Sequence, residues 1–336
     1  MGKEKAARTR HFHNMFEISS LIQKAIRRRD ANLAYYAANE LVPKFRNYLW
    51  KRLLTVSAED CFDMITGRIV ELRRMDDNHQ DNKYIAIAVS TLLNARKNRD
   101  ADYYACNLLN SRDTADISKY VSEPVRDDTC ATKNGHCMFD LAICLRRAID
   151  EADDVMAGYA ANELLVYYPK FCWKTLIMKA QEMGYPEVVS EIRALSKIGE
   201  LTKGGVTFLP YAKAITILLK VAKYKSTDFY LTDFIYNDKI DLSQYDNVQY
   251  QIPDYVYDCH TYKGKAMKRT KEMFIRDEQA ALVPLHEGEY DHASWEHHFW
   301  LCDNGFYRED YTPHPSKERM KELESGIVQL TLFGNE

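Results

Sequence analysis

Residues 15–54 read MFEISSLIQKAIRRRDANLAYYAANELVPKFRNYLWKRLL, and residues 138–177 read MFDLAICLRRAIDEADDVMAGYAANELLVYYPKFCWKTLI. The second segment repeats the first at an offset of 123 positions without a gap, and both contain YAANEL followed by Trp-Lys. A pattern that returns at a fixed distance is typical of a duplicated structural unit. The sequence therefore predicts two copies of one fold.

The duplication extends beyond these segments. Residues 88–104 (AVSTLLNARKNRDADYY) are matched by residues 214–230 (AITILLKVAKYKSTDFY) at an offset of 126. Within each copy, apolar residues recur at helical spacing, and Asp30 and Asp153 occupy the position of an N-cap before the next helix. Further amphipathic helices are expected over 84–97 and 212–223. Each copy is therefore expected to be a unit of several short helices.

The composition supports a helical fold. The 336 residues include only 13 glycines and 9 prolines, about 7% together against a usual ~12%, whereas β-sandwiches and barrels need many Gly/Pro turns. We predict an all-α protein with a duplicated helical unit and a less regular C-terminal region. The predicted boundaries are 1–125 for copy 1, 126–240 for copy 2, 241–325 for a C-terminal region with a basic helix over 263–281 and an irregular stretch after it, and 326–336 for an extended tail.

Charge and hydropathy exclude several classes of protein. The net charge of −3 and the pI of about 6.4 exclude a chain that is polycationic throughout. No run of 18 apolar residues is present, which predicts no membrane association, and MGKEKAARTR lacks the apolar core of a secretory signal. The eight cysteines are therefore expected to be reduced thiols in a cytoplasmic protein.

Common catalytic motifs are missing from the sequence. There is no GxxxxGK[ST] loop to hold phosphates, and GxSxG, HExxH and paired CxxC motifs are absent too. We therefore predict that the protein is not an enzyme, and that it uses no cofactor and no metal.

Three segments carry a resemblance to a known family. They are YLWKRLLTVSAED at 48–60, NARKNRDA at 94–101 and IPDYVYDCHTYKGK at 252–265. The chain resembles, over about 15–110 and 250–285, the C-terminal helical part of the replication-associated recombination protein A family, the bacterial relatives of clamp-loader ATPases. The family's ATPase and lid modules have no counterpart in this sequence. Two departures are Phe62, near the place where the family has a glycine, and the degraded second copy of the acidic triplet at 180–182.

The resemblance implies a fold like the clamp-loader collar and a link to DNA replication or repair. It does not imply ATP hydrolysis. It leaves open a partnership with a separate clamp-loader-type ATPase.

Two basic clusters are candidates for binding nucleic acid, since lysine and arginine neutralise phosphates. The first is Arg27, Arg28 and Arg29 with Lys24 one turn earlier; the alternative is a solvated helix end that complements the helix dipole. The second lies beside His260, and the alternative is a charged surface helix. Its members are Lys263, Lys265, Lys268, Arg269 and Lys271.

Two acidic or histidine-rich stretches invite catalytic interpretations. Glu59 and Asp60 could act as an acid/base pair, but a helix cap or a salt bridge to Arg52 is the favoured interpretation. The loop 286–298 contains four histidines and four acidic residues, and of these His286, Glu287, Asp291, His292, Glu296, His297 and His298 could supply metal ligands. No spacing in it matches a known zinc site, so an aromatic-rich polar loop that packs on the helices is favoured.

The tail contains a short peptide motif. Gln329, Leu330, Thr331, Leu332 and Phe333 are similar to the pentapeptide with which bacterial polymerases and repair proteins bind the β sliding clamp. The alternative is an extended segment that packs on the chain's own core. The favoured hypothesis is a non-enzymatic accessory factor of bacterial or phage DNA replication or repair, tethered to the clamp by this tail.

Two other hypotheses stay open. One is a DNA-binding or scaffold subunit of a clamp-loader-like assembly with a separate ATPase. The other is a metal-dependent enzyme that uses loop 286–298. A homo-oligomer is compatible with all three hypotheses.

Overall fold

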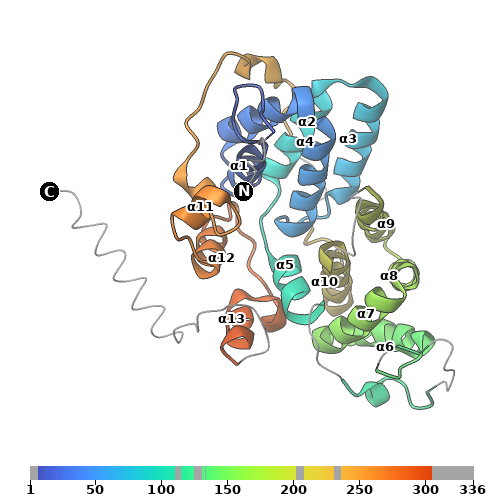
Figure 1. Cartoon of the computed structure of the whole chain (residues 1–336). Coiled ribbons are helices and arrows are strands. Elements are labelled where there is room, and N and C mark those ends of the chain that lie inside the picture. The colour runs from blue at the N-terminus through green and yellow to red at the C-terminus, as the bar shows by residue number, and fades with distance from the viewer. Residues whose placement is uncertain are drawn as a thin grey trace.

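The computed structural model describes residues 7–109, 115–124, 131–132, 134–201, 208–230 and 236–304. These residues form helices and no β-strand, so the predicted all-α class is confirmed (Figure 1). The first unit contains α1 (Met15–Arg27), α2 (Ala31–Glu59), α3 (Thr66–His79), α4 (Asn82–Asn94) and α5 (Asp100–Tyr104). The second unit contains α6 (Met138–Asp150), α7 (Asp154–Tyr167), α8 (Pro169–Met183), α9 (Pro186–Leu201) and α10 (Phe208–Tyr224). The C-terminal region, residues 236–304, contains α11 (Tyr262–Ala266), α12 (Lys271–Ala280) and α13 (Trp295–Asp303).

The turn between the first two helices has the same geometry in both units. Arg29 and Ala152, at equivalent positions, have positive φ angles of 55° and 53°. The next residues are the predicted N-caps. Asp30 accepts a hydrogen bond from the backbone N–H three residues later at 3.1 Å, and Asp153 does the same at 3.0 Å. Each carboxylate thus satisfies an N–H that has no partner within its helix.

Both units also break the second helix at the same place. In α2, Phe45 has φ −127° and ψ 28°, outside the helical range. Tyr168, which is 123 positions later, has φ −136° and ψ 56° and separates α7 from α8. A proline lies close to each break, Pro43 in the first unit and Pro169 in the second. Proline disrupts a helix because it has no N–H and crowds the preceding turn.

Equivalent loops precede the two units. The backbone N–H of Thr9 donates to the carbonyl four residues later at 3.1 Å, and that of Thr132 does so at 2.9 Å. Within these loops, Phe12 and Gly135 take the same left-handed conformation, with φ angles of 64° and 82°. The duplication therefore begins near residues 8 and 131, ahead of the segments that reveal it in the sequence.

A short Ile-x-x-Tyr-Val motif follows each unit. It lies at 117–121 after the first unit and at 252–256 after the second. Each copy includes a turn of 3-10 helix, η2 (Ile117–Lys119) and η5 (Asp254–Val256). The motif is thus a further part of the duplicated sequence.

Each copy of this motif packs on the unit that it does not follow. The first copy lies on the second unit, where the Arg147 guanidinium donates to the carbonyl of Tyr120. The second copy lies on the first unit, where Lys24, the equivalent of Arg147, donates to the carbonyl of Tyr255 at 2.8 Å. The two halves of the chain are therefore joined by a reciprocal exchange of one segment.

The two units share one hydrophobic core, since α10 packs on helices of both. Polar contacts also join them. The carboxylate of Glu191 in α9 accepts hydrogen bonds from the backbone N–H groups of Thr66 and Gly67 at 2.9 and 2.8 Å. These groups begin α3, where a negative charge complements the helix dipole. The buried ammonium of Lys213 in α10 donates to the carbonyl of Phe62 at 2.8 Å.

The structure corrects three predictions, two of them in the C-terminal region. The single helix expected over 263–281 is two helices, because Lys268 adopts a left-handed conformation with φ 57° and Thr270 then caps α12. The stretch expected to be irregular after residue 283 includes α13. Cys137 is disulfide-bonded, so the expectation of eight reduced thiols is wrong at this residue. The other described cysteines form no disulfide.

No helix in the described part of the chain has the length and apolar character needed to cross a bilayer.

Candidate functional site

The three segments that carry the family resemblance meet around one pocket of about 560 Å³. The first segment contributes Tyr48, Arg52 and Glu59, and the second contributes Arg99. The third supplies residues 258 and 260–262, and α1 and α12 complete the walls. In Figure 1, α11 and α12 lie beside α1, which places the C-terminal region against the first unit. Segments more than 150 positions apart in the sequence thus form one site.

Arg27 is the centre of a buried ion-pair network at this pocket. Its guanidinium, only 1% exposed, contacts Asp60 at 2.7 Å, Glu59 at 2.8 Å and Glu278 at 2.7 Å. The paired negative charges raise the pKa of Arg27 although burial alone would lower it. All three nitrogens of the guanidinium therefore donate to carboxylates. A planar guanidinium suits this arrangement better than an ammonium does.

A second part of the network joins α1 to the C-terminal region. The Lys24 ammonium lies 2.6 Å from Asp258 and 3.4 Å from Glu278. Burial alone would raise the pKa of Glu278, but Arg27 and Lys24 outweigh this effect and hold it below its usual range. On the other side, the buried Arg99 pairs with Asp102.

Glu59 has an unusual protonation equilibrium. Burial and the neighbouring charge of Asp60 raise its pKa to about 7, although Arg27 and Arg99 act in the opposite direction. A carboxyl group with this pKa is present in both protonation states near neutral pH. At the pocket wall it can therefore accept or donate a hydrogen bond.

The second unit packs its first two helices without such a network. Asp150 stands at the position of Arg27 and Met183 at that of Asp60, and the exposed Asp150 pairs with Lys179. Burying charges costs free energy that well-packed apolar side chains avoid. The network is thus not required by the packing of the two helices, which makes the pocket in the first unit the candidate functional site.

The predicted phosphate-binding role of Arg27 does not fit its position, because its side chain is buried among carboxylates rather than on a basic surface. Arg28 is half-buried, stacks on the ring of Tyr255 at 4.1 Å and lies 3.4 Å from Glu278. Arg29 is exposed and donates to the side chain of Asn94 at 2.9 Å. The three arginines therefore do not form one surface.

The second basic cluster is at the surface, but on no common helix face. Lys263 and Lys265 belong to α11, Lys271 begins α12, and Lys268 and Arg269 lie in the link between them. The four lysines are exposed and Arg269 is half-buried. A single helix over 263–281 would have placed Lys265, Lys268 and Arg269 on one face, and this prediction is wrong because α11 ends at Ala266. The charges remain close together along the chain, beside the pocket that Lys271 lines.

The expected salt bridge from Glu59 or Asp60 to Arg52 is absent among the described ion pairs. Arg52 instead donates to the hydroxyl of Ser19 at 2.9 Å and the amide oxygen of Gln23 at 2.8 Å. The two carboxylates bind Arg27, a partner more than thirty positions earlier.

The histidines of loop 286–298 have separate partners. His286 stacks on Phe62 with 3.6 Å between ring centroids. His292 pairs with Asp154 at 3.1 Å, and the buried His298 contacts Asn107 at 3.1 Å. His297 stacks on Trp300. The loop, all of which is described, brings no three potential ligands together.

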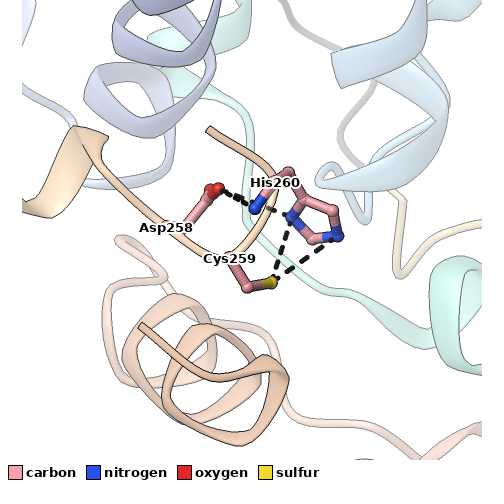
Figure 2. Close-up of side chains that lie close together, drawn as sticks. All are labelled: Asp258, Cys259 and His260. Atoms are coloured by element: carbon pink, nitrogen blue, oxygen red, sulfur yellow. Dashed lines mark hydrogen bonds and ion pairs between the residues drawn. The ribbon is translucent and has the colours of Figure 1, made fainter. Parts of the chain in front are cut away.

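A group with three potential metal ligands does occur, at Asp258, Cys259 and His260 (Figure 2). The sulfur of Cys259 lies 3.4 Å from Nδ1 of His260. However, the Asp258 oxygens already accept from the Lys24 ammonium at 2.6 Å and from the backbone N–H of His260 at 2.8 Å. A cation would have to displace these donors, so the geometry does not favour a metal.

We expect His260 to make stability depend on pH. Its interaction with Asp258, 3.5 Å away, raises its pKa to about 9. A raised pKa adds stability that is complete below the unfolded value of about 6.5 and is lost as the pH rises through about 9. Because the side chain is 63% exposed, the effect should be below about 1 kcal/mol.

This pH dependence is measurable by urea unfolding between pH 6.5 and 9, with His260→Gln as the non-titrating control. The variant should lose less stability over this range than the wild type. The same pH dependence in both proteins would contradict the assignment.

Sequence reasoning missed Glu278, since no local pattern indicates a carboxylate that pairs with a residue 251 positions away. The predicted clamp-binding residues 329–333 lie outside the described part of the chain. No protein-family model, curated protein or solved structure matches this chain.

Proposed function

We propose that this protein is a non-enzymatic accessory factor of bacterial or phage DNA replication or repair, located in the cytoplasm, that binds the β sliding clamp through Gln329–Phe333. The observation that carries the proposal is the pentapeptide itself. A short extended peptide can insert Leu332 and Phe333 into a preformed apolar pocket, while the Gln329 amide fixes the register through hydrogen bonds.

Two observations on the helical body support this proposal. Its all-α class is compatible with a fold like the clamp-loader collar. The three segments that resemble the replication-associated family converge on one pocket instead of being scattered over the surface.

A second candidate is a scaffold or DNA-binding subunit that joins a separate clamp-loader-type ATPase. It is favoured by the resemblance, which covers only the helical part that accompanies an ATPase in the family. A pull-down with and without the last eight residues separates the two candidates, because only clamp binding requires the pentapeptide. Metal analysis of the purified protein tests the remaining hypothesis of a metal-dependent enzyme.

We expect Leu332→Ala combined with Phe333→Ala to abolish clamp binding and leave the fold intact. Burial of these two side chains provides about 3–6 kcal/mol, and a single motif should bind in the micromolar range, about −8 kcal/mol. Calorimetry with a bacterial β clamp and the peptide LESGIVQLTLFGNE measures this directly.

Thr331→Ser is the matched control and should bind like the wild type, since it keeps the hydroxyl and removes only one methyl group. Equal affinity of the double variant and the wild type would contradict the proposal. So would the absence of wild-type binding at high micromolar clamp.

A further inference from the structure

The mouth of the charged pocket carries two aromatic side chains that the rest of the protein leaves uncovered. Phe16 is 61% exposed and Tyr262 is 92% exposed, and both line the pocket. Phe16 packs edge-on against Tyr48, with 6.4 Å between ring centroids, which fixes its orientation and leaves a face free. Exposed aromatic rings beside a cavity are suited to stacking on a planar ligand.

Cationic groups lie at the same mouth. The guanidinium of Arg52 donates to Ser19 and Gln23, which are both neutral, so these contacts leave its charge uncompensated. Lys271 is exposed and lines the pocket. The pocket therefore offers cationic N–H donors next to aromatic faces, a combination that fits a phosphate attached to a planar ring.

Uncharged and titratable groups on the walls can contact the edge of such a ring. The side chain of Asn14 and the carboxyl of Glu59 both line the pocket. They supply both donors and acceptors. The volume of about 560 Å³ lies within the ~300–1,000 Å³ of pockets that hold small organic ligands.

We propose that this pocket binds one nucleotide of single-stranded DNA, with the base against Phe16 and Tyr262 and the phosphate at Arg52 and Lys271. The exposed lysines 263, 265 and 268 adjoin Tyr262 in the sequence and provide charge for the flanking phosphates. A peptide with an apolar anchor fits less well, because charged side chains such as Arg27, Glu59 and Arg99 line the pocket. This inference goes beyond clamp binding and does not depend on it.

The duplication provides an internal control. The second unit retains the two rings, with Phe139 at the position of Phe16 and Phe171 at that of Tyr48. It lacks the cation, since Thr175 replaces Arg52, and Ile143 replaces Ser20. Phe139 is also exposed, at 48%. The proposal therefore assigns nucleotide binding to the first unit. Phe139→Ala tests whether the loss of an exposed phenylalanine elsewhere would weaken binding equally.

The experiment measures fluorescence anisotropy of a short labelled oligothymidylate with the full chain at low salt. Phe16→Ala combined with Tyr262→Ala should weaken binding by about tenfold to a few hundredfold, because base stacking on an aromatic side chain contributes strongly to such complexes. Lys271→Glu should weaken binding and lower the slope of log affinity against log salt by about 1. Phe139→Ala should bind like the wild type.

Competition with thymidine monophosphate shows whether the site binds single-stranded DNA or a free mononucleotide. Displacement by the mononucleotide with tighter binding of the oligomer supports single-stranded DNA. Equal affinities for the oligomer and the mononucleotide would support a nucleotide site but overturn the assignment to DNA.

The site itself would be overturned if the variant with both Phe16→Ala and Tyr262→Ala bound with wild-type affinity while folded, as verified by circular dichroism. Absence of wild-type binding to both ligands would also overturn it. Removal of the last eight residues should leave DNA binding unchanged. A failure of the clamp-binding proposal can therefore be distinguished from a failure of the DNA-binding proposal.

Discussion

Replacing Arg27 with methionine is expected to lower the free energy of unfolding by about 3–5 kcal/mol. The substitution keeps an unbranched chain in the buried space, but it removes the cation that pairs with the buried Asp60 and one of the cations that pair with the buried Glu278. An uncompensated buried carboxylate is costly, whereas an intact network is close to neutral relative to apolar packing. Equilibrium unfolding in urea measures the difference.

The duplicated unit supplies the control for this measurement. Asp150→Ala alters the equivalent position of the second unit, where the exposed Asp150 pairs with the buried Lys179, which also lies 3.8 Å from Glu182. Because Asp150 is exposed and Lys179 keeps Glu182 as a partner, this variant should lose about 1 kcal/mol, much less than Arg27→Met.

The deficit of Arg27→Met should also shrink as the pH falls, because protonation neutralises the buried carboxyl groups that have lost the charge of Arg27. A deficit that stays below about 1 kcal/mol at neutral pH would show that the network contributes little to stability.

Truncation of Trp50 to alanine should cost about 3–5 kcal/mol, since the indole has no exposed surface and leaves a cavity when removed. The indole N–H also donates to Asp76 at 2.6 Å, and this carboxylate in turn accepts from Arg46 at 2.7 Å. Loss of the indole therefore leaves one acceptor of a buried network with fewer donors. The melting temperature and the urea midpoint should both fall.

The equivalent Trp173→Ala should cost less, about 1–2 kcal/mol, because less apolar area is lost from a half-buried ring. Trp173 stacks on Tyr211 with 4.1 Å between ring centroids, and its side chain is partly exposed. The duplication predicts equivalent positions for Trp50 and Trp173, and both follow their helix breaks at the same distance, but the two rings differ in burial. Equal costs at the two positions would contradict this difference in packing.

Local features of the sequence were sufficient to predict much of the fold. Periodic apolar residues, the N-caps Asp30 and Asp153, and the scarcity of glycine and proline predicted an all-α chain, because helices form from contacts three and four residues apart. The repeat was visible since both copies preserve the YAANEL string. The clamp-binding proposal likewise depends on a linear peptide, which acts as an extended segment and is readable without a tertiary structure.

Only the tertiary structure could assign the charged residues to their roles. The sequence suggested that Arg27 is a solvent-facing cation, but its carboxylate partners are 33 and 251 positions away. Burial and pairing depend on which distant segments pack together, and no local window contains that information. For the same reason the reciprocal exchange of the Ile-x-x-Tyr-Val motifs and the pocket beneath Tyr262 emerged only when the C-terminal region was seen to pack against the first unit.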